Sequence, residues 1–187
     1  NPIQRVNSVY ADTILHRVFT NADYASRYGM EIGGEGKPLN WLKVNAGANI
    51  YNYKISGQVL DYQETRSNQD WVYSINAGVQ ADFAPTWSTG LQVNYLSERP
   101  TVQGKDSRFL TPHFNLSKGF LKGAITAQLL CQFIELNKKW GVNEQRITTY
   151  SNDFYTTTNY IYEKNVFLIN LNFNLHKLNQ FIKLPKS

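Results

Sequence analysis

Hydrophobic and polar residues alternate along several stretches of the chain. In YSINAGVQADF, residues 73 to 83, the odd positions from Tyr73 to Phe83 carry apolar side chains, whereas the even positions from Ser74 to Asp82 carry polar side chains or glycine. Successive side chains of a β-strand point to opposite faces of its sheet. The alternation therefore predicts a strand with one apolar and one polar face.

The same pattern recurs along the chain, and no stretch has a helical period. It is clear in residues 40–53, 87–96, 125–133 and 166–175 and weaker in residues 27–34 and 107–116. Residues 13–20 are a further candidate, either as a strand or as part of an extracellular hairpin. We expect an all-β chain with about eight antiparallel strands.

The connections between these strands differ in length in a regular order. Short ones, with the Pro, Gly and Ser of tight turns, fall at 34–40, 83–87 and 116–121; long polar ones fall between them at 55–70, 97–106 and 137–165. Outer-membrane barrels have short periplasmic turns and long extracellular loops. A soluble sandwich has no reason to sort its loops in this way, so the order predicts an antiparallel transmembrane β-barrel in the bacterial outer membrane.

The polar sides of these strands carry mostly Asn, Gln, Gly and Ser, whereas the outer face of a soluble antiparallel sheet is usually charged. We therefore expect the apolar sides to face lipid and the polar sides to line a wet lumen, where amides can contact a plug or a passing solute. The lumen-facing candidates are Asn45, Asn49, Asn76, Gln80, Gln92, Asn94, Gln128 and Gln132. The lipid-facing candidates are Val44, Ala46, Ala77, Val79, Leu91, Val93, Ile169 and Leu171.

Large aromatic residues stand near the predicted strand ends. Outer-membrane barrels carry girdles of such residues at the level of the lipid headgroups, on both sides of the apolar band. The aromatic girdle is expected to consist of Trp41, Trp71, Tyr73, Phe83, Trp87 and Tyr95.

The chain has a net charge of +5, yet its 19 Lys and Arg are spread along the sequence. A nucleic-acid-binding protein gathers such residues on one face beside stacking aromatics, so we expect no nucleic-acid partner. The single cysteine, Cys131, excludes an internal disulfide and a cysteine cluster for zinc. It shares the apolar side of its strand, where an inert thiol is expected.

The chain offers no motif for catalysis or metal binding. His16, His113 and His176 are far apart in the sequence and lack ligand spacing. No Ser or Cys nucleophile has a base near it in sequence. We therefore expect no enzymatic activity, no metal and no cofactor.

Three stretches resemble the C-terminal barrel segment of TonB-dependent receptors: residues 1–10, 27–51 and 156–187. The resemblance implies uptake of a scarce nutrient, such as a chelated metal, cofactor or oligosaccharide, energised by the TonB system. It also implies a barrel of about 22 strands, of which residues 1–187 would be a single but incomplete domain. Its partners would be outer-membrane lipid, its own N-terminal plug and remaining strands, with a surface lipoprotein left open. One departure is the basic C-terminal tail, which lacks the terminal aromatic residue common in outer-membrane proteins.

The start of the sequence bears on completeness. No signal peptide is visible at Asn1, so either a leader was removed or the chain is part of a longer one. Two rivals remain open: a complete small eight-stranded outer-membrane barrel with a structural or adhesive role, and a soluble β-barrel or sandwich that binds a ligand. Dependence on detergent separates the membrane interpretations from the soluble one.

Overall fold

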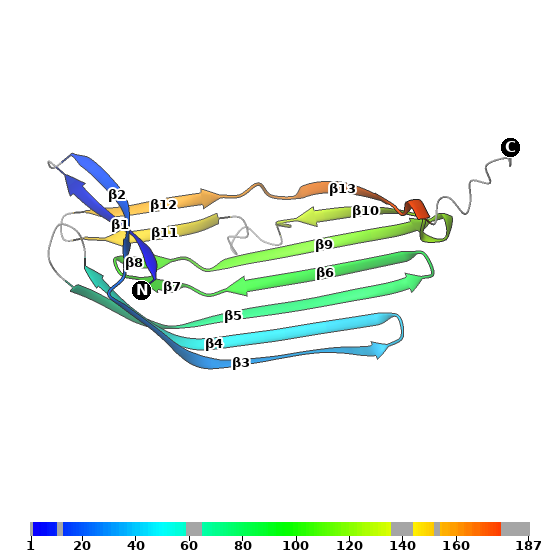
Figure 1. Ribbon diagram of the computed structural model, residues 1–187, viewed down its shortest axis with the longest axis horizontal. Coiled ribbons are helices and arrows are strands. Elements are labelled where there is room, and N and C mark those ends of the chain that lie inside the picture. The colour runs from blue at the N-terminus through cyan, green and yellow to red at the C-terminus, as the bar shows by residue number, and fades with distance from the viewer. Residues whose placement is uncertain (1, 11–12, 59–64, 136–143, 152–153, 177–187) are drawn as a thin grey trace.

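The computed structural model describes residues 2–10, 13–58, 65–135, 144–151 and 154–176. The described residues form thirteen β-strands (Figure 1). The strands are β1 (Ile3–Tyr10), β2 (Ile14–Asn21), β3 (Tyr24–Leu39), β4 (Leu42–Gln58), β5 (Thr65–Ala84), β6 (Trp87–Leu96), β7 (Arg99–Thr101), β8 (Gly104–Asp106), β9 (Phe109–Phe120), β10 (Ile125–Gln132), β11 (Glu144–Tyr150), β12 (Tyr155–Ile161) and β13 (Val166–Phe173).

Seven of these strands form one antiparallel sheet, in the order β13-β10-β9-β6-β5-β4-β3. Tight turns join β3 to β4, β5 to β6, and, through the short 3-10 helix Leu121–Gly123, β9 to β10. These turns lie together at one end of the sheet, here called the turn end (Figure 1). The sheet is open, with β3 and β13 as its outer strands, and the described residues form no closed barrel. The all-β antiparallel prediction is confirmed, while closure is not seen within the described chain.

Several strands are longer than the alternation predicts. The expected turn 34–40 is wrong for most of its length, because β3 continues to Leu39 with a register shift between Gly36 and Leu39. A β-bulge takes up extra residues without ending the ladder, so glycine and proline do not stop this strand. Likewise β9 runs to Phe120 through most of the expected turn 116–121. In the expected loop 55–70, β4 continues to Gln58 and β5 begins at Thr65, and residues 59–64 lie outside the described residues.

The long connections contain strands that the sequence did not predict. β7 and β8 form a hairpin within 97–106, β11 and β12 lie within 137–165, and the four make a sheet in the order β12-β11-β8-β7. β1 and β2 form a separate hairpin. We call these six strands the cap, because they gather at the end of the main sheet opposite the turns (Figure 1). Thr-rich segments such as YTTTNYI have no apolar period, so periodicity could not reveal them.

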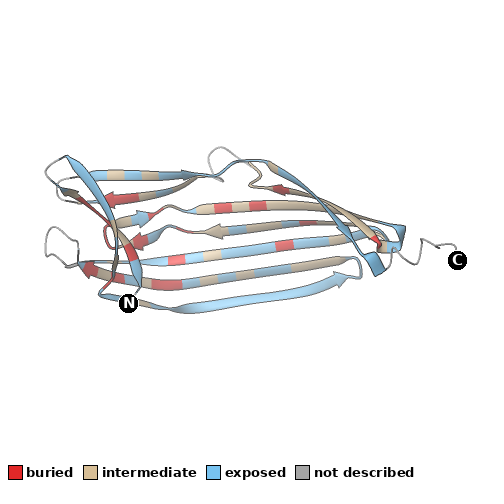
Figure 2. Ribbon diagram, turned by 45° about the horizontal axis from the view of Figure 1, so that its top comes forward, coloured by how far each residue is buried: buried red, intermediate tan, exposed pale blue. Residues whose placement is uncertain are grey.

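The packed core is small and belongs to the cap end. Val6, Ala22, Ile55 and Val102 are buried against one another, with Tyr53 among the partly buried residues around them. Ile55 projects from the same face of β4 as Asn45 and Asn49, which we call the polar face. The cap therefore covers one end of the polar face. Buried residues gather there, while much of the main sheet is exposed (Figure 2).

Candidate functional site

The pairing register sorts the side chains of the main sheet into two faces. Val79 pairs with Val44 on one side and Leu91 on the other, and this row continues through Phe114, Cys131 and Phe167. By alternation along each strand, all eight lipid-facing candidates share this apolar face. The eight amide candidates lie on the polar face, in rows such as Asn45, Gly78, Gln92, His113 and Gln132.

The apolar face is unusually exposed for its composition. Among the residues on it, Met30, Ile32 and Ile169 are 73%, 75% and 76% exposed. Soluble monomers rarely expose a contiguous apolar surface of more than a few hundred Å². An apolar face across seven strands is therefore unusual for a protein that meets water on all sides.

Aromatic residues mark two levels on the apolar face of β5. Near the turn end, the Phe83 ring stacks on Trp87 at 6.2 Å between centroids. Toward the cap, Tyr73 lies 5.7 Å from Tyr95, and Trp71 meets Tyr28 edge-on at 6.3 Å. The sixth girdle candidate, Trp41, occupies the β3–β4 turn and is 47% exposed.

The spacing of the two levels matches a membrane. Phe83 follows Tyr73 by ten residues, which is about 33 Å along a strand. At a strand tilt of about 40°, that length spans about 25 Å, the height of the apolar band of an outer-membrane barrel. β4 and β5 continue toward the cap beyond the level of Tyr73.

Two residues at the turn-end level were missed by the sequence reasoning. The Lys118 ammonium lies 4.6 Å from the centroid of the Trp87 ring and 5.0 Å from that of Phe120. A lysine at this level can rest its aliphatic stem on apolar surface while its charge reaches the interface. The i, i+2 spacing of Lys118 and Phe120 beside a turn was the available signal.

On the polar face, the amide side chains lie across neighbouring strands. A Cβ atom at Gly78 would stand 2.2 Å from Gln92 Oε1 and 2.3 Å from Asn45 Oδ1. The missing side chain at position 78 therefore provides the room that both amides occupy. This packing makes the polar face a dense layer of hydrogen-bonding groups.

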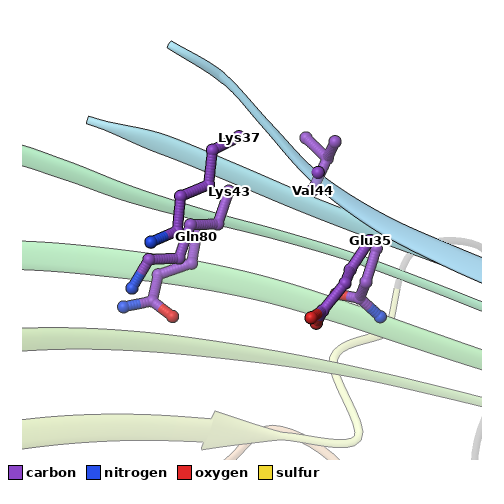
Figure 3. Close-up of a pocket in the computed structure, with 7 residues that line it drawn as sticks. Glu35, Lys37, Lys43, Val44 and Gln80 are labelled. Atoms are coloured by element: carbon purple, nitrogen blue, oxygen red, sulfur yellow. The ribbon is translucent and has the colours of Figure 1, made fainter. Parts of the chain in front are cut away.

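A charged hollow of about 360 Å³ lies on the polar face at the turn end, lined by Glu35, Gly36, Lys37, Lys43, Val44, Asn45 and Gln80. Lys37, Lys43, Gln80 and Glu35 project to the same side of the sheet, whereas Val44 projects to the other (Figure 3). Glu35 and Lys37 were not predicted as part of this face, because residues 34–40 were assigned to a turn, whereas Lys43 lies on the polar side of its strand as expected. Their placement adds both signs of charge to a face that is otherwise largely neutral.

Two ion pairs lie beside β7 and β8 of the cap. The Arg99 guanidinium lies 2.5 Å from the Asp106 carboxylate, and the Lys105 ammonium lies 2.6 Å from Glu98. Burial alone would lower the pKa of Arg99, but the hydrogen bond to Asp106 and the charge of that carboxylate, with smaller contributions from Tyr53 and Tyr51, together outweigh it, so the pKa is raised. The Glu98 carboxylate likewise raises the pKa of the exposed Lys105. Both cations stay charged at neutral pH and are already paired.

A buried amide connects two parts of the cap. Gln103 Nε2 donates to the backbone oxygen of Asn7 at 2.9 Å, and the backbone N–H of Asn7 donates to Gln103 Oε1 at 2.8 Å. The Asn7 side chain also donates to Thr149 Oγ1 at 3.2 Å. The side chain of Gln103 thus completes the pairing of β1 as a neighbouring strand would.

The three histidines remain apart. His16 stacks on Tyr10 at 5.3 Å, His113 lies between Gln92 and Gln132 on the polar face, and His176 follows β13. No group of His, Cys, Asp or Glu suited to a metal ion occurs among the described residues. Cys131 is a buried free thiol opposite Phe114 on the apolar face. Within the same ranges, no helix has the length and apolar character needed to cross a membrane.

The fold and its two faces define an antiparallel sheet built to separate an apolar surrounding from a polar one. Comparison with known families agrees: residues 1–173 match the model of the outer membrane protein beta-barrel family. The chain belongs to this family, whose members reside in the outer membrane of Gram-negative bacteria. A search among curated proteins gave no match, and a search among solved structures gave none either.

Proposed function

We propose that the chain is a wall segment of a TonB-dependent outer-membrane transporter that takes up a nutrient such as a chelated metal, a cofactor or an oligosaccharide. In this proposal the apolar face meets lipid and the polar face lines the lumen. The observation that carries it is the register, which sets a row of exposed apolar side chains back to back with a layer of amides. The chain has no enzymatic role in this account, and its partners are lipid, a plug, the TonB system and further strands of its own barrel.

The open edges of the sheet support a wider barrel. Among the described strands, β3 and β13 each have a neighbour on one side only. An unpaired backbone group in lipid costs several kcal/mol, so both edges need further strands. The polar face also offers Gly, Ser and short amides along β5 and β6, which would underfill an eight-stranded barrel whose narrow interior side chains must fill.

Uptake is tested by following what cells remove from their medium. A wild-type strain, a strain lacking this protein and a strain with inactive TonB would be grown in the same medium, and the remaining solutes measured by mass spectrometry. The proposal predicts at least one solute that both altered strains leave behind. The proposal is contradicted if the strain lacking the protein depletes every solute as the wild type does. It is also contradicted if the strain with inactive TonB still depletes the solutes that the strain lacking the protein leaves behind.

The rival with a specific structural test is the complete small barrel. Residues 1–187 would be refolded in detergent micelles, and boiled and unboiled samples compared by gel mobility. The wall-segment proposal predicts aggregates or multimers, because the edges of β3 and β13 find no partner within the chain. A compact, monomeric species whose mobility changes on heating would favour the small barrel.

A further inference from the structure

A second hollow on the polar face has a different chemistry from the charged one. It measures about 240 Å³ and lies where β5, β6 and β9 run side by side. Two cross-strand rows form it: Asn76, Asn94 and Thr111, and next to them Ser74, Leu96 and Phe109. Ile75 and Tyr95 also line it, but by alternation their side chains belong to the apolar face.

The polar groups of this hollow are neutral and available. Two amides and two hydroxyls line it, and none of its eight lining residues is charged. Ser74, Asn76 and Thr111 make no side-chain hydrogen bond with any described residue, and Asn94 Oδ1 accepts only a long one, 3.5 Å, from Gln92 Nε2. Each amide presents a donor and an acceptor side by side, and each hydroxyl can do either.

An aromatic ring closes one side of the hollow and is held in place from behind. The Phe109 ring lies 5.4 Å from that of Tyr162, which stacks on Phe133 at 5.6 Å with the planes 10° apart. His113 meets Phe133 edge-on at 5.6 Å. This row of rings joins β9 to the segments that follow β10 and β12, so Phe109 is fixed without help from a ligand.

Resting on the proposed uptake function, we propose that this hollow binds one unit of a neutral, hydroxyl-rich solute, namely a sugar residue of an oligosaccharide. Paired hydroxyls would bond to the amides of Asn76 and Asn94, and the C–H face of the ring would rest on Phe109. The volume admits one such unit. The neutral lining gives no stabilisation to a phosphorylated or anionic chelate, whereas charged side chains line the turn-end hollow.

The test uses the full-length protein in a detergent without a sugar headgroup, lauryldimethylamine oxide. It would be applied to an array of neutral and acidic oligosaccharides, and the affinity for the strongest neutral binder would then be measured by calorimetry. Phe109→Ala and Asn94→Ala should each weaken binding by about tenfold, since loss of one contact worth about 1.4 kcal/mol has this effect. Thr111→Val, which keeps the side-chain shape, should weaken it by about fivefold through loss of one hydrogen bond. Asn115→Ala, on the same face outside the hollow, should leave affinity unchanged.

Each outcome decides the matter. Binding confined to neutral oligosaccharides and weakened by these variants supports the inference. The inference is overturned if no oligosaccharide binds or if acidic oligosaccharides bind more tightly than neutral ones. It is also overturned if Thr111→Val, shown to be folded by its heat-modifiable mobility, binds as tightly as wild type. The two proposals can fail separately. If the folded protein takes up some other solute with the help of TonB, the proposed function holds and this inference is wrong.

Discussion

Val79 of β5 and Leu91 of β6 are direct cross-strand partners, and 45% and 46% of their surfaces remain exposed. Their sequence neighbours Gly78 and Gln92 are partners too, on the opposite face. A shift of one residue along either strand therefore moves a side chain from the apolar face to the polar face.

The first prediction concerns charge on the two faces. Val79 is one residue from the midpoint between Tyr73 and Phe83, so Val79→Arg should cost roughly 2–4 kcal/mol of folding free energy in a bilayer. Gln80→Arg, which places the charge on the polar face, should cost little. Denaturant titration of the full-length protein in vesicles measures both, and equal costs at the two positions would show that the faces are wrongly assigned.

A second prediction concerns the close approach of β3 and β4. A Cβ atom at Gly29 would stand 2.1 Å from the backbone oxygen of Ile50, and a backbone atom cannot swing aside as a side chain can. Gly29→Ala should therefore destabilise the protein by about 1–3 kcal/mol. Gly34→Ala, with nothing within 4 Å of the added atom, is the matched control and should be neutral. Similar unfolding midpoints for the two variants would refute the strand approach described here.

A third prediction concerns the cap. Gln103→Ala removes both bonds to the Asn7 backbone, and leaving those buried groups unpaired should cost about 1–3 kcal/mol. The loss should be local, so hydrogen exchange should accelerate in β1 while β6 stays protected. Gln145→Ala is the control, because this half-buried glutamine near the start of β11 makes no hydrogen bond to Asn7. It should leave exchange in β1 unchanged. Unchanged exchange in β1 would mean that Gln103 does not hold the hairpin.

A fourth prediction concerns sidedness. On a Cys131→Ser background, Thr13→Cys at the tip of the β1–β2 hairpin should react with a membrane-impermeant maleimide added to intact cells. Asn40→Cys in the β3–β4 turn should react only after the outer membrane is opened, because tight turns face the periplasm. Labelling in the reverse order would invert the topology.

The sequence predicted the central strands of the main sheet well because one physical signal, the alternation of apolar and polar residues, governs them. Alternation predicted the observed bounds of β6, Trp87–Leu96, and identified the central part of β5. It succeeds there because successive side chains of a strand point to opposite faces of the sheet. It also ordered the amides correctly relative to the apolar residues, although the solvent of each face stays a prediction.

The cap and the hollows could not be predicted in the same way. Pairs such as Ile147 with Asp106, or Gln103 with Asn7, join segments far apart in the chain, and no local period reports them. Gly and Pro within residues 34–40 gave a turn signal that a register shift overrode, which hid Glu35 and Lys37 as lining residues. Phe109 escaped notice because its role depends on Tyr162, which comes from a later strand connection.

The central claim, that odd positions of β5 face lipid and even positions face a wet lumen, is tested most directly by a spin-label scan. Single cysteines at positions 73 to 83 on the Cys131→Ser background would be labelled in the full-length protein in vesicles, and collision with apolar oxygen and with a water-soluble nickel chelate measured at each site. We expect a period of two, with oxygen collisions highest at odd positions such as Val79 and nickel collisions highest at even positions such as Gln80. The opposite phase, or no period at all, would contradict it.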